Sequence, residues 1–123
     1  MTLAERFCAE AATRILVKDG PYGTAIQGLG LTEADYRGDL ALTMDQKGNN
    51  DLLNLTRPGD IAAICEQYIA AGADLLASNT FNANRISQAD YGAEDLVGDI
   101  NRAAARIIRD CADRATDADG RQR

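Results

Sequence analysis

The chain has 123 residues and a mass of 13.2 kDa, and 46% of its residues are hydrophobic, which suits one domain with a single core and argues against a disordered polymer. A formal net charge of −6 and a sequence pI near 4.5 disfavour a nucleic-acid partner, since a phosphate backbone repels an acidic surface. The apolar runs are far shorter than the roughly 20 residues of a membrane span, and the start of the chain lacks the apolar region of a secretory signal. We therefore expect a cytoplasmic protein that binds neither nucleic acid nor a membrane.

The cysteines also point to a reducing compartment. Cys8, Cys65 and Cys111 are widely separated, have no C-x-x-C spacing and have no histidine to complete a zinc set. Each lies on the apolar stripe of an expected helix, where a free cysteine packs as a small hydrophobic side chain. We expect no metal ligand and no catalytic nucleophile among them.

The first expected elements are a short helix over residues 3–12 and a brief strand at Ile15–Val17. The strand is apolar and contains β-branched residues, and it ends at Asp19 and Gly20 in the stretch "RILVKDGPYGT". This is the pattern of a buried parallel strand with a carboxylate at its tip.

A long stretch rich in glycine and polar residues follows, from about residue 20 to residue 54. It predicts at most one or two helical turns, near residues 24–27 and 32–36. Glu33 and Asp35 lie in it and are expected to be solvated surface acids. A connection of this length is more often functional than idle.

A helix is expected next, between Thr56 and Gly72. Thr56 can cap its start, Pro58 suits the first turn, Asp60 favours the positive end of the helix dipole, and Gly72 stops the helix. Its apolar face recurs at helical spacing. The residues of that face are Ile61, Ile64, Cys65, Tyr68 and Ile69.

The segment "ADLLASNTF" then predicts a second short strand, which ends in polar residues including Asn79 and Thr80. A second long amphipathic helix is expected over about residues 93–115. The polar tail, residues 116–123, is expected to fray.

The order strand, helix, strand, helix predicts an α/β fold with parallel strands. Ligands bind beyond the carboxyl ends of such strands, so Asp19 and the Asn79-Thr80 pair are expected at the same edge. Two alternatives remain open at this point: Asp19 is equally well explained by turn chemistry, and the Asn79-Thr80 pair by capping a helix that begins near Asn82. No dinucleotide or P-loop glycine pattern is present.

Several segments resemble one family in both content and order. They are "RILVKDGPYGTAIQ", "EADYRG", "QKGNNDLLNLTRP", "YIAAGADLLASNTFNANRISQADYG" and "DLVGDINRAAARI". They are similar to the homocysteine S-methyltransferase family, and in particular to the amino-terminal part of the homocysteine-binding domain of its cobalamin-dependent methionine synthases. Family members usually read Asp-Gly-Ala-Met-Gly-Thr and Glu-Thr-Asn-Thr-Phe where this chain has Asp19 to Thr24 and Ala77 to Phe81.

The resemblance implies a (β/α)₈ TIM barrel of about 250 residues, of which residues 1–115 would form the N-terminal portion and residues 116–123 a polar tail. It also implies a substrate-binding role. The residues expected to hold the amino-acid end of homocysteine are Asp19, Gly20, Asn79, Thr80 and Phe81.

The reaction implied by the resemblance is transfer of a methyl group to the sulfur of homocysteine. In the family, zinc held by three cysteines keeps that sulfur as a reactive thiolate, and cobalamin on another domain carries the methyl group. The family's zinc cysteines lie in a Gly-Gly-Cys-Cys context that this sequence does not contain. We therefore expect zinc and cobalamin in the complete enzyme but neither bound by residues of this chain.

The leading expectation is thus a fragment that works with the remainder of the barrel and a cobalamin-carrying domain, and that is inactive alone. One alternative is a noncatalytic α/β binding or assembly module that completes its sheet with a partner chain. Another is a small independent α/β enzyme with Asp19 as its base. Unpaired strands and uncovered helices would make the isolated chain prone to aggregate.

Overall fold

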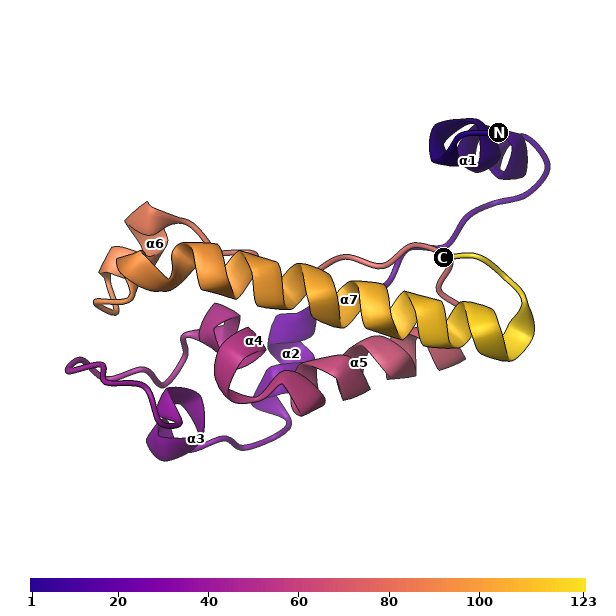
Figure 1. Cartoon of the computed structure of the whole chain (residues 1–123). Helices are drawn as coiled ribbons and strands as arrows, with labels where there is room; N and C mark the ends of the chain where they lie inside the picture. The colour runs from indigo at the N-terminus through magenta and orange to yellow at the C-terminus, as the bar shows by residue number, and fades with distance from the viewer.

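The computed structural model describes all 123 residues, which form helices and no β-sheet (Figure 1). None of these helices is both long enough and apolar enough to cross a membrane. The α-helices are α1 (Leu3–Ala11), α2 (Tyr22–Gln27), α3 (Glu33–Arg37), α4 (Leu53–Thr56), α5 (Pro58–Ala70), α6 (Arg85–Ala89) and α7 (Val97–Asp119), and short 3₁₀ turns η1 (Asn50–Leu52) and η2 (Glu94–Leu96) precede α4 and α7.

The core lies where α5 packs along α7, with α2 and α4 closing its side (Figure 1). From α7, Ile100, Ala104 and Cys111 are buried, and their spacing is that of the amphipathic helix predicted over about residues 93–115. The central cluster of buried side chains consists of Tyr22, Ile26, Tyr36, Leu53, Ile61 and Ile64.

The predicted α/β fold, the N-terminal portion of a TIM barrel, is wrong for this structure. The two expected strands meet only in one isolated parallel bridge, between Lys18 and Leu75. Ile15 is 87% exposed and Val17 is 52% exposed, whereas a barrel strand would bury both. A parallel pair needs further strands and covering helices to gain stability; with no third strand to pair with, the segments stay extended but irregular. The alternative of an α/β binding or assembly module that completes its sheet with a partner chain fails for the same reason, because this structure has no sheet to complete.

Helix α1 is confirmed as a helix, yet it buries none of its residues and stands apart from the other helices (Figure 1). A capping box holds its start: Glu5 N–H donates to Thr2 Oγ1 over 3.2 Å, and Thr2 N–H donates to the Glu5 carboxylate over 2.6 Å. The expectation that Cys8 packs on a buried stripe is wrong, because this residue is exposed. Cys65 and Cys111 are buried as predicted.

The ends of α5 follow the predicted signals in part. Pro58 occupies the first turn, and Gly72, with φ of +108°, lies just past the end, where a left-handed backbone favours glycine. The predicted cap at Thr56 is wrong: this residue closes α4, and its hydroxyl points back to the Leu52 carbonyl over 3.4 Å.

The long connection contains α2 and α3, as the sequence predicts. Glu33 and Asp35 are partly exposed, in line with the expected surface position, and both also take part in hydrogen bonds that shape the loop. Asp35 completes a capping box with Thr32, and the Glu33 carboxylate accepts backbone N–H groups of Gln46 and Lys47 over 2.6–2.9 Å. These hydrogen bonds fold the loop back on α3 and lower the pKa of Glu33.

The C-terminal tail is more ordered than expected. Residues 116–119 continue α7, and Gly120 follows in the left-handed conformation. The Arg123 guanidinium pairs with Asp119 over 2.8 Å and donates to the Ala73 carbonyl over 3.2 Å. These contacts hold the end of the chain against the segment that precedes Leu75.

Candidate functional site

Asp19 joins the two extended segments of the chain. Its N–H donates to the Leu75 carbonyl over 2.9 Å, and its carboxylate accepts the N–H of Ala77 over 2.9 Å. The other carboxylate oxygen accepts the Lys18 ammonium over 2.9 Å, and the Asp19 side chain has no exposed surface while that of Lys18 is 64% exposed. Asp19 is therefore a buried acceptor with one largely exposed cationic partner.

Gly20 is required by close packing. A Cβ atom at this position would lie 2.7 Å from the ring of Tyr68, a distance that carbon atoms do not tolerate. The Tyr68 hydroxyl donates to the Pro21 carbonyl over 2.7 Å, so α5 holds the loop after Asp19 against its own surface. The shape of this loop is thus fixed by packing from α5.

Asn79 is buried and is held by the turn before α4. Its side-chain amide donates to the Asn50 carbonyl over 2.9 Å, and its own carbonyl accepts the amide of Asn54 over 2.7 Å. The alternative that the Asn79-Thr80 pair caps the next helix is wrong. Asn84 caps α6, with its side chain accepting the N–H of Ser87 over 2.9 Å.

Thr80 and Phe81 lie differently from Asn79. The Thr80 hydroxyl shares a hydrogen bond of 2.8 Å with that of Ser78, and the Phe81 side chain is 94% exposed. The backbone N–H groups of Gly20 and Phe81 donate no hydrogen bond within the chain. The structure therefore brings Asp19 against Ala77 and ties Asn79 to the core, while Phe81 projects into solvent.

A buried polar cluster around Asp51 was not predicted from the sequence. The Asp51 carboxylate accepts the N–H of Asn82 over 2.9 Å, and its carbonyl accepts the amide of Asn54 over 2.8 Å. Burial raises the pKa of Asp51, and the side-chain oxygen of Asn54 is buried without a partner. The one available signal was the dense polar run "NNDLLN", which precedes the helix instead of ending a strand.

A second unpredicted cluster joins the long loop to α6. The side chains of Asn49 and Gln88 exchange two hydrogen bonds of 2.9 and 3.0 Å, and Gln46 donates to the Tyr91 carbonyl over 2.8 Å. All three amides are buried and satisfied, which makes them structural groups. They position the segment that carries Asp51.

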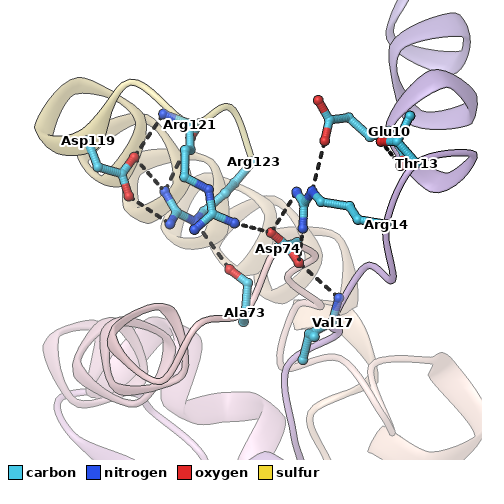
Figure 2. Close-up of polar contacts among 9 residues, drawn as sticks. All are labelled: Glu10, Thr13, Arg14, Val17, Ala73, Asp74, Asp119, Arg121 and Arg123. Atoms are coloured by element: carbon cyan, nitrogen blue, oxygen red, sulfur yellow. Dashed lines mark hydrogen bonds and ion pairs between the residues drawn. The ribbon is translucent and has the colours of Figure 1, made fainter.

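Arginines surround a third acidic group, Asp74, at the opposite end of the second extended segment (Figure 2). The Arg14 guanidinium donates to both Asp74 oxygens over 3.0 and 3.1 Å, and Arg121 adds a further close ion pair. The N–H of Val17 also donates to Asp74 over 2.9 Å. The hydrogen bonds from Arg14 and Val17 lower the pKa of Asp74 to about 2.

The cysteines do not fit a zinc centre. Such a centre needs three or four ligands within about 2.0–2.3 Å of the metal, and no group of three or more His, Cys, Asp or Glu side chains is arranged to hold one. Cys65 and Cys111 lie between α5 and α7, and burial raises the pKa of the Cys65 thiol to about 12. Both are poor thiolates in this setting.

A protein-family model described as homocysteine S-methyltransferase matches residues 16–122. The match covers Asp19 and all of the segment from Ala77 to Phe81, and it begins after helix α1. Since it spans most of the sequence, the family that the motifs indicate is confirmed: the chain belongs to the homocysteine S-methyltransferase family.

Proposed function

We propose that this chain holds the amino-acid end of homocysteine in a methyl transfer to the homocysteine sulfur, as part of a methionine synthase. The observation that carries the proposal is the family match across both segments that meet at Asp19. The chain would position the substrate, while activation of the sulfur and delivery of the methyl group come from the remainder of the enzyme.

Asp19 is proposed to bind the ammonium group of homocysteine. The Lys18 ammonium, which already rests on one Asp19 oxygen, is largely exposed and can leave without breaking the hydrogen bond to Ala77. Exchange of one ammonium group for another keeps the buried carboxylate paired, which avoids the cost of an unpaired charge. This supports a role for Asp19 in binding the substrate ammonium group, in place of the role of catalytic base in the small-enzyme alternative.

The backbone N–H groups of Gly20 and Phe81 are proposed to serve the substrate carboxylate, because neither has a partner within the chain. Asn79 and Thr80 would shape the loop that carries the N–H group of Phe81. Asn79 supports this role through its hydrogen bonds to Asn50 and Asn54.

Zinc and cobalamin are proposed to belong to other parts of the enzyme. The thiols of this chain do not fit zinc, so we assign sulfur activation to residues outside it and methyl delivery to a cobalamin-carrying domain. The proposal predicts no methyl transfer to homocysteine by the 123 residues alone.

Replacement of Asp19 by Asn tests the binding role. The Asn side-chain oxygen still accepts from Ala77, but the neutral amide loses the charge-assisted hydrogen bond, so homocysteine binding should weaken by about 1–3 kcal/mol. Isothermal titration calorimetry measures this. 4-Mercaptobutanoate, which lacks the amino group, should bind Asp19→Asn and the parent chain equally.

The matched control is Asp117→Asn, which removes an exposed carboxylate of α7 that makes no ion pair. Circular dichroism verifies that each variant is folded. Equal homocysteine affinity of Asp19→Asn and the parent would contradict the binding role and favour the alternative that Asp19 only forms the turn.

A further inference from the structure

A cavity of about 530 Å³ lies between helix α1 and the C-terminal end of the chain. Its lining includes none of Asp19, Gly20 and residues 79–81, although Leu16 and Leu75 of the two extended segments border it, and helix α1 lies outside the range of the family match. Its lining includes the apolar side chains of Leu3, Phe7, Leu16 and Leu75. The cavity therefore has surface for an apolar group that no side chain of this protein fills.

The lining of the cavity also carries an excess of positive charge. Four arginines line the cavity against two carboxylates, in a chain whose net charge is −6. The arginines are Arg6, Arg14, Arg121 and Arg123, and the carboxylates are Glu10 and Asp74. A concentration of arginine on an acidic protein indicates a local preference for anions.

The arginines differ in how far their donors are used. Arg14 is fully engaged by Glu10 and Asp74, as Figure 2 shows. Arg121 donates with a single side-chain nitrogen, to Asp74, and Arg6 has no hydrogen-bond or ion-pair partner. Arg6 and Arg121 thus keep donors that can face a ligand in the cavity.

We propose that this cavity binds an organic anion with one carboxylate and an unbranched apolar chain. The ligand carboxylate pairs with Arg6 and Arg121, and its chain lies against Leu3 and Phe7. Asp74 does not repel the ligand strongly because Arg14 and Arg121 already neutralise it. Binding would fix helix α1, which otherwise buries nothing, against the end of the chain.

Decanoate is the probe, titrated into the 123-residue chain by calorimetry at a concentration where light scattering shows a monomer. We expect one saturable site per chain. Arg6→Gln should weaken binding at least fivefold, and because Arg6 is exposed and unpartnered the variant should fold normally. Arg106→Gln, which removes an exposed arginine of α7 outside this cavity, is the matched control and should bind like the parent.

Two further ligands test the apolar and the charged contributions to binding separately. Decanol, which has the chain without the charge, should bind at least fivefold more weakly than decanoate and should not distinguish Arg6→Gln from the parent. Acetate, which has the charge without the chain, should not saturate at the same concentrations. Phe7→Ser should weaken decanoate binding without changing the response to salt.

Three outcomes would overturn the proposal. They are decanoate binding that Arg6→Gln leaves unchanged, decanol binding as tight as that of decanoate, and the absence of saturable decanoate binding.

Discussion

Asp74 brings together three parts of the chain that are distant in the sequence. Arg14 lies 60 residues before it and Arg121 lies 47 residues after it, and both guanidinium groups reach its carboxylate. The backbone of Val17 supplies a third donor. Asp74 is nearly buried whereas Arg14 and Arg121 are about half exposed, so solvent weakens each pair.

Replacing Asp74 by Asn should lower the free energy of unfolding at pH 7 by about 1 kcal/mol, a value kept small by the exposure of both arginines. Because the folded-state pKa of about 2 is below the ordinary value of 3.8, the carboxylate stabilises the fold above about pH 4. This contribution is lost as the pH falls through 2. The difference between parent and variant in urea unfolding should therefore shrink from pH 7 to pH 2.

Asp117→Asn provides the comparison for this pH series, because Asp117 is exposed and makes no ion pair. It should follow the parent at every pH. A stability difference for Asp74→Asn that persists undiminished at pH 2 would contradict the role of the carboxylate charge.

Among the elements, α5 and α7 form the stable unit, and α1 stands outside it. Ile61 of α5 is fully buried in the central cluster, and Ile100 of α7 is fully buried as well. Phe7, the largest side chain of α1, is 47% exposed. Most of the apolar burial that stabilises the fold therefore comes from the interface of α5, α7 and their neighbours.

Two truncations should separate these elements. Ile61→Ala removes buried methyl groups and leaves a cavity, so it should cost about 2–5 kcal/mol of unfolding free energy. Phe7→Ala removes a partly exposed side chain and should change that value by no more than about 0.5 kcal/mol. Urea unfolding followed by circular dichroism measures both changes in unfolding free energy. Equal effects of the two truncations would contradict the conclusion that α1 lies outside the stable unit.

Helices α1, α2, α3, α5 and α7 could be predicted from the sequence because their signals are local. Pro58 and Gly72 bracket α5, and Thr32 with Asp35 begins α3. The two predicted strands do not form, because a strand depends on partners that the pattern at Ile15–Val17 does not reveal. Here that segment has one bridged neighbour, so its apolar residues remain in solvent.

The candidate site could be predicted only in part. The sequence marked Asp19 and the segment ending at Phe81, but the contact of Asp19 with Ala77 spans 58 residues and depends on the fold. Asp51 and Asn54 escaped prediction because their run of polar residues resembles a solvated loop, although both are buried. Burial of polar groups is set by tertiary packing, which periodicity does not encode.

At the scale of the whole molecule, apolar side chains remain in solvent on several segments. The large ones outside helix α1 include Ile15, Val17, Phe81 and Ile86. Exposed apolar surface of this kind favours association between copies. These exposed side chains therefore favour association of the chain independently of the cavity beside helix α1.

We expect the isolated chain to self-associate as its concentration rises, with an apparent mass in light scattering that exceeds 13.2 kDa. Ile15→Gln combined with Ile86→Gln should shift this association to higher concentration, since both side chains are nearly fully exposed and their removal leaves no cavity. A sharp, reversible thermal transition that is independent of concentration would contradict this expectation.

The ion pairs at Asp74 also decide how the molecule responds to mechanical tension. Arg14 follows helix α1, and Arg121 follows helix α7, so one carboxylate links the regions near both ends of the chain. A force applied to the two ends loads this connection and the contacts of Arg123 with Asp119 and Ala73 first, and it reaches the helices of the core only after these contacts break. Stretching would thus release the ends at low force and leave α5 and α7 packed together until a second, stronger event.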